Sequence, residues 1–364
     1  MKTQLCRRIQ RTASDRNKRA GRGRPAGLYL LTSEWGGDRL TAINEKAPRR
    51  ATQSLGGEMF KTVLTATDLL EGSDAAVMSA IELCRRNEAK LLAIHVLESS
   101  YSGIFRHFVK DFKTGEEMLV SKEYEERARR TLRAKWAATL GPYMNYDIEI
   151  TAGVPWIEIL RAARKDRADL VVLGSHGQGA EEKGVSRRTG TVGSTVEGVV
   201  MGANCPVMIA NRTTQEEKLG FGKVMVCVDF SRSCEYAIEF ARKMANVYGS
   251  QILLFHMFRV TPFSLYLQTN LEKEMSSVKE GLHAYCKDVS GSTECHCHVW
   301  EGTLPYISIL NFARENSVDL IVMGSHTRRS REKWYVGSTV HEASARADCP
   351  VAVVTHPLDV LRMD

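Results

Sequence analysis

The sequence has no long apolar run and few of the common nucleotide-binding signatures. None of its hydrophobic stretches approaches the roughly 18–20 residues that a membrane-spanning helix needs, so we expect no transmembrane segment. The Gly-x4-Gly-Lys-Ser/Thr signature of a P-loop is absent. Gly177-Gln-Gly179 begins like a dinucleotide-binding motif, but Glu182 occupies the place of its third glycine. A simple P-loop or dinucleotide-binding motif is therefore excluded.

Most of the chain also lacks an excess of positive charge, although the whole sequence carries a formal net charge of +7. Residues 1–58 hold 13 Lys and Arg against 5 Asp and Glu, which leaves 37 basic and 38 acidic residues for 59–364. The excess positive charge belongs to the N-terminal segment, so we do not expect the rest of the chain to bind nucleic acid specifically.

The N-terminal segment, residues 1–58, has no persistent amphipathic period and no continuous apolar region of the secretory type. Its composition favours a disordered extension. An organelle transit peptide, a nucleic-acid-binding arm and a start codon assigned too far upstream are the alternatives, because Met59 leads directly into the first predicted strand.

The nine cysteines are an odd number and are scattered, with apolar neighbours around most of them. A chain with this much core does not need a disulfide framework, so we expect reduced, buried thiols and a cytoplasmic location.

The chain repeats itself. Two apolar runs ending in an acid, Lys61–Asp68 and Lys223–Asp229, are each followed by a predicted helix and a second run, at Leu91–Val96 and Ile252–Met257. Three later segments also occur in both copies. The apolar run Asp169–His176 matches Asp319–His326, Gly-Ser-Thr begins at Gly193 and at Gly337, and Cys-Pro-Val begins at Cys205 and at Cys349. Strands that alternate with helices and are apolar throughout predict a parallel sheet covered on both faces.

The predicted fold class is therefore α/β, with two tandem doubly wound domains, each a five-stranded parallel sheet flanked by helices. Two domains also suit a chain of 364 residues. The predicted divisions are an extension at 1–58, a first domain at 59–211, a linker at 212–222, a second domain at 223–356 and a tail at 357–364.

In an open parallel sheet, ligands bind outside the carboxyl ends of the strands. Gly174 and Gly177 follow the fourth strand, where a missing side chain lets backbone amides approach an anion. Gly193, Ser194 and Thr195 open a helix whose free amides suit a phosphate. Asp68 can contact a ribose or an adenine edge, or help to hold a cation such as Mg²⁺. An ordinary turn and helix cap would use the same residue types.

Together these motifs resemble the universal stress protein family, and the resemblance covers nearly all of the chain past residue 58. The nucleotide-binding branch of that family carries Gly-x2-Gly-x9-Gly-Ser/Thr between the fourth strand and the fourth helix, with an Asp after the first strand. Here fifteen residues separate Gly177 from Gly193 in the first copy. The second copy keeps nine before Gly337 but has Thr327 in place of the second glycine.

The resemblance implies that ATP or AMP binds mainly in the first domain as a regulatory ligand, with Val96 on the adenine side. In the second copy the resemblance implies a second, weaker nucleotide site, whose residues are Asp229, Gly324, Thr327, Gly337, Ser338 and Thr339. Arg328, Arg329, Arg331 and Lys333 can still attract phosphate there. The family also implies that the two domains pair through their last strands, near Val207–Ile209 and Val351–Val353, as two chains do in single-domain relatives. A homodimer of the whole chain is a further association that the resemblance allows.

Two other groups of residues attract attention. His176 and His326 could act as general bases, but no nucleophile or paired acid is placed beside them, so we expect them to order their loops. Cys295-His-Cys-His298 looks like a metal cluster. Aligned with the first copy, however, Cys295 and Cys297 fall on Tyr146 and Ile148, one buried face of a strand. We expect no metal site.

The sequence thus predicts a tandem universal stress protein that binds an adenine nucleotide in stress-response signalling. One rival keeps the fold without the nucleotide, as a scaffold with a protein or lipid partner. Another is a slow nucleotide hydrolase. No water-activating group is evident, and the Ser-Gly-Gly-x-Asp-Ser loop of the related ATP-pyrophosphatases is missing, so no catalytic residue is assigned.

Overall fold

A computed structural model of the chain describes residues 59–69, 71–98, 108–110, 117–119, 121–175, 192–210, 220–260, 268–289, 293–325 and 336–355. The extension at 1–58, most of the linker and the C-terminal tail lie outside these residues. The domain boundaries therefore stay predictions. None of the helices that the structure describes is both long and apolar enough to cross a bilayer.

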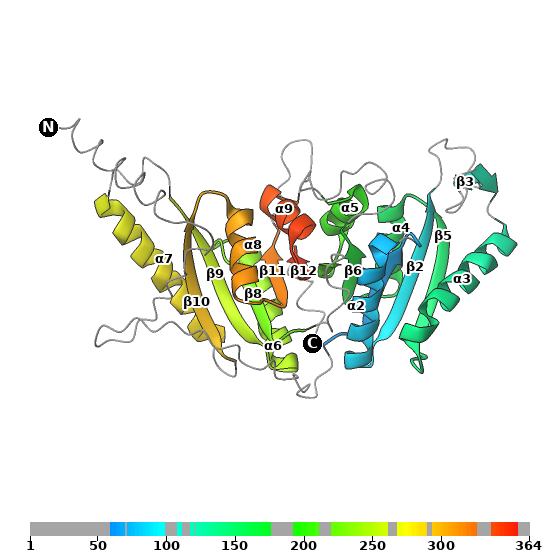
Figure 1. Ribbon diagram of the computed structural model, residues 1–364, viewed down its shortest axis with the longest axis horizontal. Helices are drawn as coiled ribbons and strands as arrows, with labels where there is room; N and C mark the ends of the chain where they lie inside the picture. Colours follow the sequence, from blue (N-terminus) through cyan, green and yellow to red (C-terminus); the bar gives the residue numbers. More distant parts are fainter. Residues whose placement is uncertain are drawn as a thin grey trace, which may run out of the picture. The chain divides into compact units, whose positions relative to one another are not determined.

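The first copy contains the strands and helices that its apolar runs predict (Figure 1). They are β1 (Thr62–Thr67), α2 (Glu71–Asn87), β2 (Lys90–Glu98), β3 (Phe108–Lys110), β4 (Glu117–Leu119), α3 (Lys122–Leu140), β5 (Tyr146–Gly153), α4 (Pro155–Lys165), β6 (Leu170–Gly174), α5 (Ser194–Gly202) and β7 (Val207–Ala210).

The second copy repeats the order of the main elements. They are β8 (Lys223–Cys227), α6 (Arg232–Tyr248), β9 (Gln251–Arg259), α7 (Gln268–Val289), β10 (Cys295–Gly302), α8 (Pro305–Glu315), β11 (Leu320–Gly324), α9 (Ser338–Arg346) and β12 (Val351–Val354).

One difference from the predicted order is the small antiparallel hairpin of β3 and β4 between β2 and α3, with Phe108 opposite Leu119. The sequence predicts only a charged, helix-forming stretch there. Its strands are three residues long, too short for an apolar alternation to indicate them.

Each copy forms a five-stranded parallel sheet, and the two sheets join into one with strand order β10-β9-β8-β11-β12-β7-β6-β1-β2-β5. The junction is the antiparallel pair of β7 and β12, in which Ala352 lies opposite Met208. The predicted fold class and the pairing of the last strands are both confirmed.

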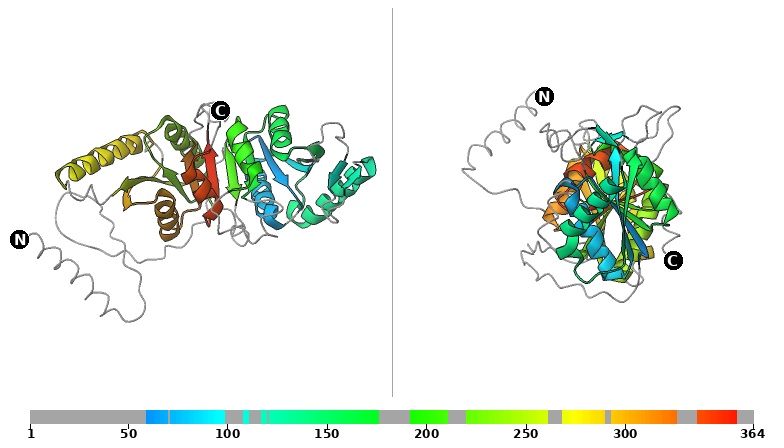
Figure 2. Two further views of the ribbon diagram at one scale, coloured as in Figure 1. Left: turned by 90° about the horizontal axis from the view of Figure 1, so that it is seen from above. Right: turned by 90° about the vertical axis from the view of Figure 1, so that its right-hand side faces the viewer.

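Helices cover both faces of the sheet (Figure 2). Helices α2, α3, α6 and α7 bury their apolar residues in one core cluster, which we call the α2 face. Helices α4, α5, α8 and α9 bury theirs in a second cluster, the α5 face. Each cluster contains residues of both copies, which explains why the strands are apolar on both sides.

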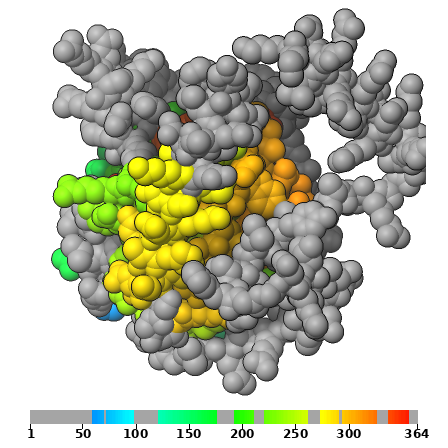
Figure 3. Space-filling view, turned by 90° about the vertical axis from the view of Figure 1, so that its left-hand side faces the viewer, coloured from blue at the N-terminus to red at the C-terminus, as the bar shows by residue number. Residues whose placement is uncertain are grey.

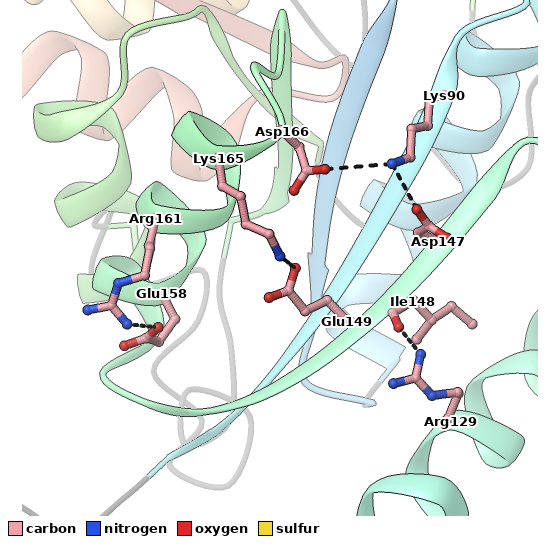
Figure 4. A network of polar contacts seen from close by, with 9 residues as sticks. All are labelled: Lys90, Arg129, Asp147, Ile148, Glu149, Glu158, Arg161, Lys165 and Asp166. Atoms are coloured by element: carbon pink, nitrogen blue, oxygen red, sulfur yellow. Dashed lines mark hydrogen bonds and ion pairs between the residues drawn. The ribbon is translucent and has the colours of Figure 1, made fainter.

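The outer strand of the first copy, β5, carries charges along its edge (Figure 4). Lys90 Nζ lies 2.8 Å from Asp147 Oδ2 and 3.6 Å from Asp166 Oδ1. Its ammonium donates hydrogen bonds to Asp147, which raises the pKa of Lys90. Arg129 donates to the backbone carbonyl of Ile148. Charged side chains on an edge strand oppose pairing with another strand, so this edge is protected.

Candidate functional site

The described candidate ligand residues of the first copy lie at the carboxyl ends of the strands and at the start of α5. Val96, near the end of β2, is partly buried and packs into the core of the α5 face. Along β1, Leu64 and Ala66 point to the same face. Asp68 lies one residue beyond the end of β1 and close enough to His95 for its charge to act on that imidazole. The structure therefore places Val96 on the face that α5 covers, with Asp68 at the end of the neighbouring strand.

Helix α5 begins at this edge with an N-terminus that has no side-chain cap. Gly193 is the N-cap residue, with φ −63° and ψ 152°, and no side chain accepts a hydrogen bond there. The first backbone bond of the helix runs from the Glu197 amide to the Gly193 carbonyl, 3.0 Å away. The amides of Ser194 and Thr195 precede it and have no acceptor within the helix. Such amides, together with the helix dipole, attract an anion.

Gly174 is required by packing, in addition to any role that the sequence predicts for its backbone amide. A Cβ atom at this position would lie 2.8 Å from the backbone oxygen of Gly72, at the start of α2. The missing side chain thus faces α2, on the opposite face from α5. The glycine is required by helix packing, whatever its backbone amide contacts.

A backbone hydrogen bond joins the two ends of the loop between β6 and α5: the Gly193 amide donates to the Ser175 carbonyl at 2.9 Å. His176 and Gly177 belong to this loop and lie outside the described residues. The position of Gly177, and with it the predicted phosphate loop, stays a prediction.

The second copy uses its aspartate differently. The backbone amide and the hydroxyl of Ser231 both donate to Asp229 Oδ1, at 3.0 and 2.5 Å. Ser231 in turn caps α6 by accepting from the Cys234 amide at 3.3 Å. The first copy has Leu70 at the equivalent position, so Asp68 cannot form this turn with a serine. Asp229 therefore links the end of β8 to the cap of α6 through the hydroxyl of Ser231.

The helix start of the second copy also differs. Gly337 has φ +94°, which a residue with a side chain rarely adopts, and open space surrounds its Cβ position. Ser338 is exposed at the first position of α9 and Thr339 follows it. Gly324 packs against α6, where a Cβ would lie 2.4 Å from backbone atoms of Ser233. Thr327 lies outside the described residues.

A repeated histidine was not assigned a role from the sequence. His95 Nδ1 donates to the Thr67 carbonyl and His256 Nδ1 to the Val228 carbonyl, each at 2.8 Å. Each bond ties the second strand to the residue just before the aspartate. Burial lowers the pKa of His95, so its imidazole stays neutral. The equal offsets of the two histidines in their copies were the signal that could have identified them.

The candidate helix starts of the two copies meet across the junction. Glu197 of α5 and His341 of α9 occupy equivalent positions, four residues after Gly193 and Gly337, and His341 Nε2 lies 3.6 Å from Glu197 Oε1. The first turn of α5 carries this acid, whereas the first turn of α9 has no acidic residue.

The Cys295-His-Cys-His298 sequence lies on β10, with Cys295 and Cys297 packed into the core of the α2 face. His298 packs against Phe312 of α8, on the opposite face, with ring centroids 4.9 Å apart. As expected for a strand, neighbouring residues point apart. No group of three or more His, Cys, Asp and Glu suited to a metal ion occurs within the described part of the chain.

Comparison with known proteins agrees with this architecture. The sequence model of the universal stress protein family matches residues 59–211 and 220–355. A universal stress protein of Methanocaldococcus jannaschii is 29% identical over 163 residues, covering 44% of this chain and 88% of the relative. Another, from Thermus aquaticus, is 32% identical over 153 residues, covering 42% of this chain and 98% of the relative.

Solved structures show the same fold over most of the chain. A universal stress protein from Archaeoglobus fulgidus superimposes with a TM-score of 0.55 at 21% identity, over 81% of this chain and 96% of that one. A protein of unknown function from Pseudomonas aeruginosa PAO1 gives 0.57 at 12% identity, over 84% and 96%. With two matched domains in one chain, this protein belongs to the universal stress protein family.

Proposed function

We propose that this tandem universal stress protein binds an adenine nucleotide, ATP or AMP, in its first domain as a regulatory ligand. The observation that supports the proposal is that Val96 and the uncapped start of α5 belong to one face of the sheet, with Asp68 at the carboxyl end of β1.

These residues suit the parts of a nucleotide. The amides of Ser194 and Thr195 and their hydroxyls present donors for phosphate oxygens. Val96 offers a partly buried apolar surface for a base. Asp68 offers a carboxylate for a ribose hydroxyl, an adenine amino group or a Mg²⁺ ion that accompanies the phosphates.

The second domain is the weaker candidate. Asp229 already accepts two hydrogen bonds from Ser231, and these would compete with a ligand for the same oxygen. In its favour, the first turn of α9 lacks the acid that Glu197 places in α5. The hydrogen bonds of Asp229 count against the second domain, whereas the less acidic first turn of α9 counts in its favour.

The rival function is a scaffold that binds a protein or lipid and no nucleotide. It gains support from Gly174, whose missing side chain the packing of α2 already explains. A slow nucleotide hydrolase is the other rival, and it would need a group that activates water beside the start of α5, where Glu197 and His341 lie.

The test is calorimetric titration of the full-length protein with ATP and AMP, comparing Ser194→Leu with Ser338→Leu. Both serines are exposed at the first position of their helices, so neither change should disturb the fold. A lost hydrogen bond to a charged group costs about 1.5–3 kcal/mol, which is roughly a tenfold or larger loss of affinity. We expect that loss for Ser194→Leu and near wild-type affinity for Ser338→Leu.

Two further measurements separate the outcomes. Mass spectrometry of small molecules released from the denatured wild-type protein should identify an adenine nucleotide. Equal losses of nucleotide affinity in both serine variants would show that both domains bind nucleotide. If wild type binds neither ATP nor AMP at millimolar concentration, the scaffold function replaces the proposed one.

A further inference from the structure

The turn after β1, which carries Asp68, has an unusual backbone conformation. Leu69, the next residue, has φ +70°, in the left-handed region that residues with a large side chain rarely adopt. The second copy has Phe230 at the same position, with φ +60°. Such a conformation persists only where surrounding contacts hold it, and the contacts that do so differ between the two copies.

Hydrogen bonds hold this turn in the first copy. The Thr67 carbonyl accepts from His95 Nδ1 at 2.8 Å. The Leu69 amide donates to Thr67 Oγ1 at 3.0 Å, and the same hydroxyl lies 2.9 Å from Ser73 Oγ of α2. On the other side of Leu69, its carbonyl accepts from Lys135 Nζ at 3.2 Å. The amide and the carbonyl of the left-handed residue are therefore both bonded to side chains.

Lys135 joins this turn to two helices. It lies on α3, where its neighbours Leu132 and Trp136 are buried in the core. Its Nζ also lies 2.7 Å from Asp74 Oδ1 of α2, and both side chains are partly buried, with exposed fractions of 31% and 23%. An ammonium is a charged donor, which forms a stronger hydrogen bond than a neutral one. A single side chain thus connects α3, α2 and the Leu69 carbonyl.

The second copy holds the same turn without a lysine. Helix α7, shown in yellow in Figure 3, has Ala284 where α3 has Lys135, since each lies eleven residues before the next strand of the large sheet. The Phe230 ring instead lies against His256 and Tyr285, with ring centroids 5.1 and 6.0 Å apart. Aromatic packing therefore supports the second turn, whereas an ammonium supports the first.

We propose that Lys135 is a positioning residue for the ligand site of the first domain, whose ammonium fixes the turn that presents the Asp68 carboxylate. This inference rests on the proposed binding of a nucleotide there. Without the ammonium, the Leu69 carbonyl loses its charged partner and Leu69 can relax out of the left-handed region. That change rotates the peptide next to Asp68 and displaces its carboxylate from the ligand.

Calorimetric titration of the full-length protein with ATP tests this role. Lys135→Met should lower the affinity by about three- to thirtyfold, the range expected for a residue that acts through another. In an Asp68→Asn background the same substitution should cause little further loss, because the carboxylate that it positions is already gone. A purely structural role would give the same loss in both backgrounds.

The matched control is Lys165→Met, which removes the same charge from the ion pair of Lys165 with Glu149. It should leave the affinity for ATP unchanged, so that any loss in Lys135→Met is not an effect of net charge. Thermal melting of each variant should show that it is folded at the temperature of the titration.

The outcomes separate this inference from the proposed function. Wild-type protein that binds neither ATP nor AMP would overturn both. If wild type binds ATP, unchanged affinity in Lys135→Met, or an equal loss in the Asp68→Asn background, overturns the role of Lys135 alone. Should Lys135→Met not fold, Asp74→Asn decides the question. It weakens the hold on the ammonium, so it should give a smaller loss that again disappears with Asp68→Asn, and wild-type affinity would show that the inference is wrong.

Discussion

Asn87 Nδ2 donates a hydrogen bond to Tyr248 Oη at 2.6 Å, across the junction of the two domains. The two residues are the last of α2 and of α6 and occupy equivalent positions in the two copies. Asn87 also accepts from the backbone amide of Met59 at 2.9 Å and donates to the Leu83 carbonyl. One buried side chain therefore links the start of the first domain, its first helix and the second domain.

We expect Asn87→Ala to destabilise the protein more than Tyr248→Phe. The tyrosine variant loses one hydrogen bond, worth about 0.5–1.5 kcal/mol. The alanine variant leaves the Met59 amide and the Tyr248 hydroxyl without this partner in a buried site, at about 1–3 kcal/mol for each unsatisfied group. Urea unfolding of the full-length protein measures both changes.

The control for this comparison is Asn145→Ala, an exposed asparagine whose side chain makes a long bond of 3.5 Å to the Glu88 carbonyl. It should leave the free energy of unfolding nearly unchanged. A Tyr248→Phe variant that is as unstable as Asn87→Ala would show that the cross-domain bond, and not the Met59 amide, dominates.

The N-terminal extension should be removable up to Met59 but no further. Met59 and Phe60 are buried, with exposed fractions of 5% and 0%. Burying a large apolar side chain contributes roughly 1.5–3 kcal/mol. A chain that starts at Met59 should keep the thermal stability of the full-length protein, whereas a chain without Met59 and Phe60 should melt several degrees lower by differential scanning calorimetry. Loss of stability on removing residues 1–58 alone would contradict this view of the extension.

The lone first domain should dimerise. In the full chain, Val207–Ile209 of β7 pair with β12 of the second domain, so residues 59–211 expressed alone would expose an apolar edge strand. Light scattering at micromolar concentration should give the mass of a dimer, and a monomer there would count against β7 as a self-pairing edge.

The sequence predicts the sheet well because the repeat leaves few alternatives. The apolar runs ending in Asp68 and Asp229 predict two equivalent first strands. The last strands β7 and β12 each pair with one strand of their own copy, β6 or β11, which leaves their other edges for each other. The site is less predictable. A glycine after a strand indicates that another group lies close to the backbone there. Only the structure shows that this group is helix α2 at Gly174 and helix α6 at Gly324.

Aspartates at equivalent positions also look alike in sequence. What separates Asp229 from Asp68 is the hydroxyl of Ser231, and its hydrogen bonds depend on the local backbone as much as on the residue type.

Stability should fall in mild acid because of two histidines. Burial lowers the pKa of His95, and burial and the charge of His296 lower that of His298. The unfolded chain titrates near the ordinary value of about 6.5, so around and below that pH the unfolded state binds more protons. The stabilisation is therefore complete above about pH 6.5 and is lost as the pH falls from there towards the folded-state values.

Urea unfolding between neutral and mildly acidic pH measures this slope. His95→Asn and His298→Asn should each make the free energy of unfolding less dependent on pH, and the double variant should do so further, because the two residues lie in different domains. An unchanged slope in the double variant would assign the acid sensitivity to other groups.

Gly193 and Gly337 allow the same substitution to be tested at equivalent positions with opposite expectations for backbone strain. Gly193 has φ −63°, a conformation open to any residue, whereas Gly337 has φ +94°. Open space surrounds the Cβ position of Gly337, so a steric clash is not the reason for that glycine. Gly337→Ala should therefore cost about 1–3 kcal/mol through backbone strain, while Gly193→Ala adds no such strain and should cost about 1 kcal/mol or less, because alanine is a poorer helix cap than glycine.

Guanidinium unfolding of the two variants gives the comparison, and a titration with ATP separates strain from binding. If α5 holds the phosphates, Gly193→Ala should weaken binding without a matching loss of stability, because the added methyl group lies beside the amides of Ser194 and Thr195. Gly337→Ala should show the reverse, with lower stability and unchanged affinity at the first domain. Equal losses of stability at both positions would mean that the two helix starts share one backbone conformation, and the proposed difference between the domains would have to be withdrawn.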